Sequence, residues 1–135
     1  MSREFPPDRS ESEDARSLKG KAGFTRVVAA FNFSMAGLRA AFRDEAAFRQ
    51  EVALAVPLIL LALFMPASGI GKALMVASVL LVLIVELLNS AVEALADRIS
   101  SEKHALIKKA KDIGSAAVLI ALVNVPVVWL LVLLG

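Results

Sequence analysis

Two glutamates, Glu86 and Glu93, lie in the otherwise apolar run 84–97. At the centre of a membrane helix an aspartate costs about 2.5–3.5 kcal/mol even on scales derived from insertion experiments. Ionisable side chains at that depth are therefore rare, and those that occur usually serve a function. We interpret these two carboxylates as parts of a functional site rather than as helix-packing residues alone.

The composition indicates a membrane protein. The chain has 135 residues, of which 58% are hydrophobic, and a mean hydropathy of +0.71. This length allows about three membrane spans of roughly 20 residues each. The absence of cysteine rules out disulfides and thiolate metal ligands. The net charge of +2 comes from basic residues scattered around apolar runs, so we expect no nucleic-acid partner.

Three apolar runs predict an all-α membrane protein with three transmembrane helices. Each run is close to the length needed to cross a bilayer. Pro57 and Pro126 lie inside two of them and are expected to bend the helix locally. The runs are 46–65, 72–95 and 113–134.

The N-terminal region predicts a tail and a surface helix. Residues 1–22 are polar and lack hydrophobic periodicity, which favours a disordered cytoplasmic tail. Residues 24–43 carry apolar side chains at steps of three and four, which is typical of an amphipathic helix lying in the membrane interface. Together with the spans, this helix forms a single membrane domain over residues 23–135. The apolar stripe consists of Phe24, Val27, Val28, Phe31, Met35, Leu38 and Phe42.

Charge asymmetry predicts the topology. Fourteen of the fifteen Lys and Arg residues lie in 1–49 or 98–111, and only Lys72 lies beside the first hairpin turn. Loops rich in Lys and Arg stay in the cytoplasm. We therefore expect a multi-pass membrane protein with a cytoplasmic N-terminus.

The polar residues of the second span form one stripe. Glu86, Asn89, Glu93 and Asp97 follow one another at steps of three or four, so a helix places them on one face. At the same cytoplasmic level, the third span carries Lys111, Asp112 and Ser115. Asn89 and Ser115 taken alone could equally serve to join helices. The two glutamates on one face favour a site.

Three short segments stand out in the sequence: 45–51 (EAAFRQE), 86–93 (ELLNSAVE) followed by Asp97-Arg98, and 110–117 (AKDIGSAA). Together they resemble the bacterial integral-membrane diacylglycerol kinase family. The resemblance extends over about residues 22–135. It implies a homotrimeric bundle of three-span subunits, each with an amphipathic surface helix, that phosphorylates diacylglycerol from MgATP in the bacterial inner membrane. Without this resemblance the sequence predicts an acid-lined membrane site but not ATP, because it has no Walker A or kinase glycine-rich loop.

The resemblance also implies roles for individual residues. Glu86 matches the catalytic base, Asn89 and Lys111 assist catalysis, and Glu45 and Glu93 match the ligands of Mg²⁺. Phe33 stands where a tyrosine is expected. The positions matching ATP contacts are Arg26, Phe33, Glu45, Glu93, Glu102, Lys103, His104, Lys111 and Asp112. Those matching lipid contacts are Arg26, Ala30, Phe31, Ser34, Met35, Glu86 and Ser115.

Two alternative functions stay open at this point. A related branch with the same fold would phosphorylate undecaprenol, and the sequence does not distinguish the two lipids. A protein of another class, a small proton- or ion-conducting membrane protein, would use Glu86 and Glu93 as a relay. Ion flux in proteoliposomes without ATP would identify that second class.

Overall fold

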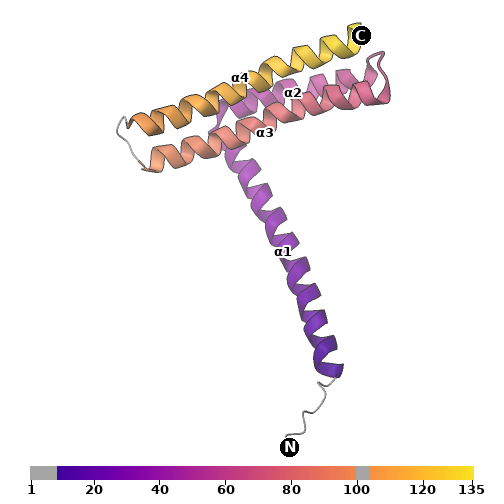
Figure 1. Cartoon of the computed structure of the whole chain (residues 1–135), viewed down its shortest axis with the longest axis vertical. Helices are drawn as coiled ribbons and strands as arrows, with labels where there is room; N and C mark the ends of the chain where they lie inside the picture. The colour runs from indigo at the N-terminus through magenta and orange to yellow at the C-terminus, as the bar shows by residue number, and fades with distance from the viewer. Residues whose placement is uncertain (1–8, 100–103) are drawn as a thin grey trace, which may run out of the picture. The chain divides into compact units, whose positions relative to one another are not determined.

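The computed structural model describes residues 9–99 and 104–135, which form four helices and no strands (Figure 1). The predicted all-α architecture is therefore confirmed. The chain divides into two compact units, Met1–Arg39 and Ala40–Gly135. The helices are α1 (Arg9–Asp44), α2 (Ala46–Phe64), α3 (Gly69–Ile99) and α4 (Ala105–Leu134).

Helix α1 is longer than the helix predicted over 24–43. It begins at Arg9, within the segment 1–22 for which the sequence analysis expects a tail, and residues 1–8 lie outside the described residues. The reason is local: this segment contains Glu, Ala, Arg, Leu and Lys, which favour a helix even without an apolar face. Further along α1, the apolar side chains of Phe24, Val27 and Phe31 are exposed, as an interfacial helix requires.

Helices α2, α3 and α4 are the three elements of the described chain that are long and apolar enough to cross a membrane. All three predicted spans are confirmed. Helices α3 and α4 both extend further on the polar side than the predicted spans 72–95 and 113–134, because their polar flanking residues continue the helix. Pro57 and Pro126 lie inside helices that continue past them.

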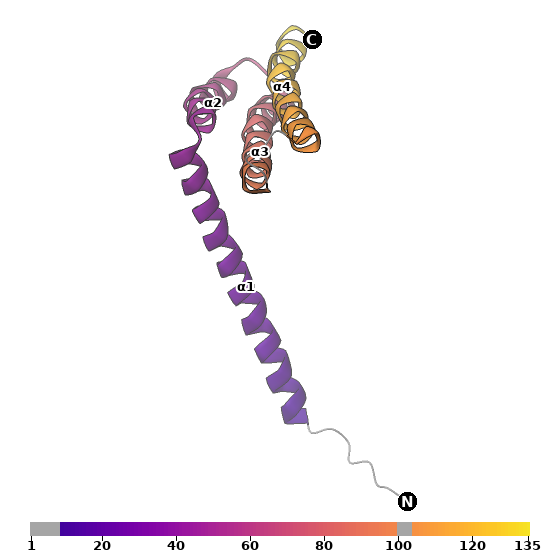
Figure 2. The same cartoon turned by 90° about the vertical axis from the view of Figure 1, so that its left-hand side faces the viewer.

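Helix α3 packs against both α2 and α4, and the three run side by side (Figures 1 and 2). Its buried apolar residues Met75, Val79 and Val82 recur at steps of three and four, which gives α3 one inward face. Helices α2 and α4 contact α3 through small residues, which let the helix backbones approach closely. These are Ala55 and Ala62 of α2 and Ala121 of α4.

The turn between α2 and α3 ends with a side-chain cap. The Ser68 hydroxyl accepts a hydrogen bond from the Gly71 backbone N–H at 3.0 Å, so it satisfies a donor that the first turn of α3 leaves free. Nearby, a Cβ atom added to Gly71 would lie 2.7 Å from Val132 Cγ1. The start of α3 and the end of α4 are therefore in close contact, and the two helices are antiparallel.

Candidate active site

The polar stripe of α3 continues the buried face of that helix. Glu86 is 5% exposed and Asn89 is 8% exposed, whereas Glu93 is half-buried and Asp97 is exposed. Along this polar stripe, burial thus decreases toward the C-terminal end of α3. A carboxylate as deeply buried as Glu86 carries a large desolvation cost unless it is neutral or has a partner.

Acidic side chains at and after the start of α2 and along α3 lie within electrostatic reach of Glu86. Glu45 and Glu93 lie close enough for their charges to act on it, and Glu51 in turn is within reach of the Glu86 charge. Glu93 also accepts a hydrogen bond from Asn89 Nδ2, at 3.4 Å. Like charges brought together in this way repel one another, so the arrangement is suited to a cation or to proton transfer.

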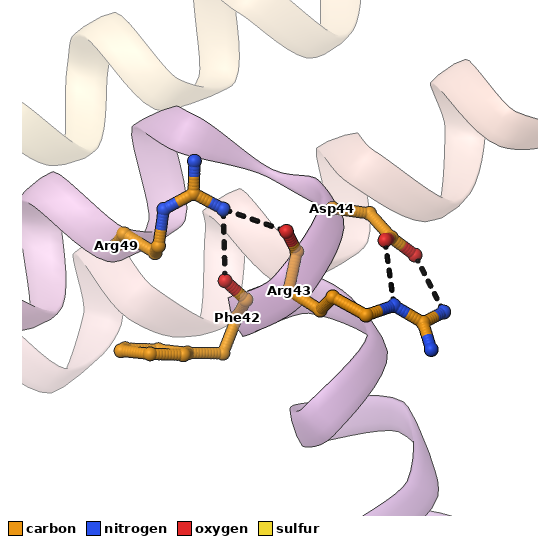
Figure 3. Close-up of polar contacts among 4 residues, drawn as sticks. All are labelled: Phe42, Arg43, Asp44 and Arg49. Atoms are coloured by element: carbon orange, nitrogen blue, oxygen red, sulfur yellow. Dashed lines mark hydrogen bonds and ion pairs between the residues drawn. The ribbon is translucent and has the colours of Figure 1, made fainter.

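Glu45 occupies the junction between α1 and α2. It is the N-cap residue of α2, with an extended backbone (φ −108°, ψ 109°), and its side chain makes no capping hydrogen bond. Across this junction the Arg49 guanidinium donates to the carbonyl oxygens of Phe42, at 3.0 Å, and Arg43, at 2.7 Å (Figure 3). These bonds satisfy the last carbonyls of α1 and fix the turn that carries Glu45.

A second arginine at this junction pairs locally. Arg43 donates from Nε and Nη2 to the two carboxylate oxygens of Asp44, at 2.8 and 3.0 Å (Figure 3). The hydrogen bond from Arg43 is the main reason that the pKa of the Asp44 carboxyl lies below its usual value. Asp44 therefore stays ionised at neutral pH, but it is paired and exposed, and is a weaker candidate for the site than Glu45.

Lys111 joins α4 to the polar end of α3. Its ammonium donates to Asp97 Oδ1 at 3.1 Å, while Lys108 pairs with Asp112 at 2.7 Å on α4 itself. Ser115 is exposed one turn further along. The predicted level of Lys111, Asp112 and Ser115 beside the acidic stripe thus agrees with the packing of α4 on α3.

The positions expected to contact ATP near the loop before α4 are described in part. Glu102 and Lys103 lie outside the described residues. His104 is the N-cap of α4, and its Nδ1 accepts a hydrogen bond from the Leu106 backbone N–H at 3.3 Å. A capping role fixes the imidazole at the start of α4.

The remaining predicted residues belong to α1, within the unit Met1–Arg39. The Ser34 hydroxyl donates to the Ala30 carbonyl at 2.9 Å, which turns it back onto its own helix. Apart from the half-buried Met35, these side chains are exposed and able to meet a ligand. They are Arg26, Ala30, Phe31, Phe33, Ser34 and Met35.

Glu51 lies near this acidic cluster, and the sequence analysis included it only as the last residue of the segment 45–51. It is the one charged residue lining an otherwise apolar cleft of about 180 Å³ between α2, α3 and α4. Its Oε2 is buried and has no hydrogen-bond partner within the described part of the chain. The available signal was a carboxylate five residues inside the first apolar helix, a position as unusual as that of Glu86.

The donor set fits a magnesium ion held with the help of a substrate. Within residues 9–99 and 104–135, no three acidic or histidine side chains converge closely enough to form a complete metal cage. Magnesium usually keeps several waters and takes only one or two protein carboxylates together with substrate phosphates. Glu45 and Glu93, whose charges both reach Glu86, are carboxylates of the kind that such an ion takes, and they number no more than it needs from the protein.

Three membrane-spanning helices with a cluster of partly buried carboxylates define an integral-membrane protein with an acidic site. Residues 32–133 match the prokaryotic diacylglycerol kinase family. The chain belongs to this family.

Individual relatives agree with the family match. The chain is 54% identical over 118 residues to a diacylglycerol kinase of Pseudomonas aeruginosa, covering 87% of this chain and 96% of that protein. It is 49% identical over 111 residues to a diacylglycerol kinase of Escherichia coli K12, covering 82% and 91%. The identity to a diacylglycerol kinase of Helicobacter pylori is 40% over 107 residues, covering 79% and 84%.

Proposed function

We propose that this protein is a lipid kinase that transfers the γ-phosphoryl group of ATP to diacylglycerol at the membrane interface. The observation that carries the proposal is the buried Glu86 carboxylate, within reach of the charges of Glu45, Glu51 and Glu93, in a chain of this family. The Pseudomonas aeruginosa and Escherichia coli relatives are named diacylglycerol kinases, and the match to this chain covers 96% and 91% of their lengths.

Glu86 is the general base of this proposal. It would accept the proton of the lipid's primary hydroxyl as the hydroxyl oxygen bonds to the γ-phosphorus and the bond from that phosphorus to the bridging oxygen of ADP breaks. The products are phosphatidic acid, ADP and a protonated Glu86. Burial suits this role because it weakens the hydration of the charged form and so makes proton acceptance easier.

Glu45 and Glu93 are the proposed ligands of Mg²⁺. When bound, the ion neutralises charge on the phosphate oxygens of ATP. Asn89 holds Glu93 through the hydrogen bond from its amide, and Arg49 fixes the backbone turn of Glu45. Lys111, now paired with Asp97, would exchange that partner for a phosphate oxygen when ATP binds.

Substrate contacts are also proposed for positions on α1 and at the start of α4. Phe33 offers an exposed ring for stacking on adenine, and Arg26 offers charge for phosphate. His104 and Asp112 lie at the beginning of α4, with Glu102 and Lys103 before them in the sequence. Lipid contacts are proposed for Ala30, Phe31, Ser34, Met35 and Ser115.

The proposed location is the bacterial inner membrane with the N-terminus in the cytoplasm. The concentration of Lys and Arg in 1–49 and 98–111 supports this orientation. It also places the polar end of α3 on the side where ATP is available. An N-terminal cysteine variant labelled only after the cells are opened would support it; labelling of intact cells would contradict it.

The direct test is transfer of labelled phosphate from ATP to a lipid in mixed micelles, with and without Mg²⁺. We expect transfer to diacylglycerol that requires Mg²⁺ and is lost in Glu86→Gln. Faster transfer to undecaprenol would assign the chain to the polyprenol branch instead. Transfer to neither lipid would contradict the proposed function.

A homotrimer with sites shared between subunits is the proposed assembly, because three spans offer few surfaces on which to enclose a nucleotide. If Glu45 and Glu86 of one site come from different subunits, mixing Glu45→Gln chains with Glu86→Gln chains should restore part of the activity. Absence of any recovery would mean that each site is built within one chain.

A further inference from the structure

Gly114 of α4 lies directly against the Asn89 side chain of α3. A Cβ atom added to Gly114 would overlap Asn89 Oδ1 and lie 3.4 Å from its Cγ. Asn89 is 8% exposed, so the amide has little room to move elsewhere. The close approach of α3 and α4 at this level therefore depends on the missing side chain of Gly114.

The two ends of the Asn89 amide have different surroundings. Its Nδ2 donates to Glu93 Oε1, and its Oδ1 is buried without a hydrogen-bond partner in the part of the chain that the structure describes. The backbone of Gly114, which offers a weak Cα–H donor, lies beside that oxygen. The helix contact thus holds the oxygen on one side and directs the N–H group toward the carboxylate on the other.

We propose that Gly114 is a positioning residue for Glu93 and acts through Asn89. The proposal rests on the proposed function, because Glu93 is taken there as a ligand of Mg²⁺. A side chain at position 114 forces the amide to rotate, and Glu93 then loses the donor that orients it. Groups that hold a metal ligand in place typically change metal affinity or activity by about 10- to 100-fold when they are lost.

The chain contains a matched control at the other end of the same helix pair. A Cβ atom at Gly71 would lie 2.7 Å from Val132 Cγ1, so Gly71 also allows α3 and α4 to approach closely. Its neighbour is a methyl group rather than an amide, and no residue of the proposed site is adjacent. Gly71→Ala therefore reproduces the crowding without disturbing Asn89.

The first measurement uses the full-length protein in micelles without metal. With ¹⁵N-labelled asparagine the chain gives side-chain amide signals from Asn32, Asn89 and Asn124, and Asn89→Ser identifies the signal of Asn89. We expect this signal to move in Gly114→Ala and, because the charged acceptor is replaced, in Glu93→Gln. It should stay in place in Gly71→Ala. An unchanged signal in Gly114→Ala would overturn the proposal.

The second measurement is the binding of Mn²⁺, in place of Mg²⁺, followed by electron paramagnetic resonance with a non-hydrolysable ATP analogue. Gly114→Ala should weaken binding by about 10-fold or more, and Gly71→Ala should leave it unchanged. Weaker binding in Glu93→Gln but not in Gly114→Ala overturns the positioning role and leaves the proposed function intact. Unchanged binding in Glu93→Gln overturns both, because Glu93 is then not a ligand.

A further variant covers the case in which Gly114→Ala does not fold. Serine at position 89 is shorter than asparagine, so Asn89→Ser/Gly114→Ala removes the overlapping amide group. Recovery of folded protein in this double variant supports a clash with Asn89. Failure of the double variant to fold, with Asn89→Ser folded, overturns the proposal because the clash must then lie elsewhere.

Discussion

The two ends of the α3–α4 pair have the same backbone contact but different chemistry. At one end Gly71 faces the Val132 methyl group, close to the buried Met75. At the other end Gly114 faces the Asn89 amide, between the buried Glu86 and the half-buried Glu93. Glycine allows close packing at both ends, and only the second contact includes groups that are costly to bury. The comparison distinguishes a helix contact that only stabilises the fold from one that also orients a polar side chain.

The largest effect on catalysis should come from replacing the Glu86 carboxylate by a neutral amide. Glu86→Gln is expected to lower kcat by about 10²–10⁴-fold, because general base catalysis contributes that much. The variant should unfold at the same or higher denaturant concentration than the natural protein, since a neutral amide costs less to bury than a carboxylate. Phosphate transfer and unfolding in mixed micelles measure the two effects.

Glu51→Gln is the matched control, because it also neutralises a partly buried carboxylate near Glu86. A smaller loss of kcat in this variant would distinguish the base from a neighbouring charge. Equal losses in the two variants would argue that the site depends on its total charge rather than on one base.

A substitution at the apolar end of the α3–α4 pair should change stability without changing catalysis. Gly71→Ala is expected to lower the free energy of unfolding by about 1–3 kcal/mol through crowding against Val132. A gain of about 1 kcal/mol from helix propensity would offset part of this loss. Denaturant titration measures the change, and the Mg²⁺ dependence of phosphate transfer should not move.

Gly69→Ala serves as the control at this end, because a Cβ there meets open space in the described structure. The denaturant concentration at which Gly69→Ala unfolds should be unchanged or slightly higher. A shift in Mg²⁺ dependence in Gly71→Ala would break the distinction between the two ends.

A third pair of variants tests the backbone turn before α2, which carries Glu45. Arg49→Gln removes at least one of the hydrogen bonds to the Phe42 and Arg43 carbonyls and should cost about 1 kcal/mol of stability. It should also raise the Mg²⁺ concentration needed for half-maximal activity, because Glu45 follows that turn. Arg43→Gln, which breaks only an exposed pair with Asp44, should leave the Mg²⁺ dependence unchanged.

The smallest effect is expected at the exposed margin of the polar end. Asp97→Asn removes the ion pair with Lys111, in which the Asp97 side chain is largely and the Lys111 side chain partly accessible to water. Pairs of this kind are screened, so the unfolding midpoint should not shift measurably. The KM for ATP should change by no more than a few fold. A large rise in KM would show that Asp97 itself takes part in nucleotide binding.

The sequence predicted the spans well because each is a long apolar run. A run of about 20 apolar residues has few alternatives to a membrane helix. The sequence also placed Glu86, Asn89 and Glu93 on one face, since helical spacing alone determines which residues share a face. The start of α1 was missed because a polar helix without an apolar stripe gives no periodic signal.

Contacts between helices were beyond the reach of spacing. Glu51 belongs to α2 and Glu86 to α3, and nothing in the order of residues shows that their charges come near one another. Gly114 was noticed only as part of a family segment, because a glycine in a helix carries no mark of the side chain that it faces. Nothing in the sequence around Arg49 indicates that its side chain bonds to the carbonyls at the end of α1.

The sequence by itself determined that this is a three-span membrane protein, where the acidic residues lie along α3, and which family it resembles. These properties follow from hydropathy, helical period and the order of residues within short segments. The tertiary structure decided which acids gather around Glu86 and which glycine accommodates Asn89. Such contacts depend on how α2, α3 and α4 pack, and packing brings together residues whose separation in the chain carries no information about their distance in space.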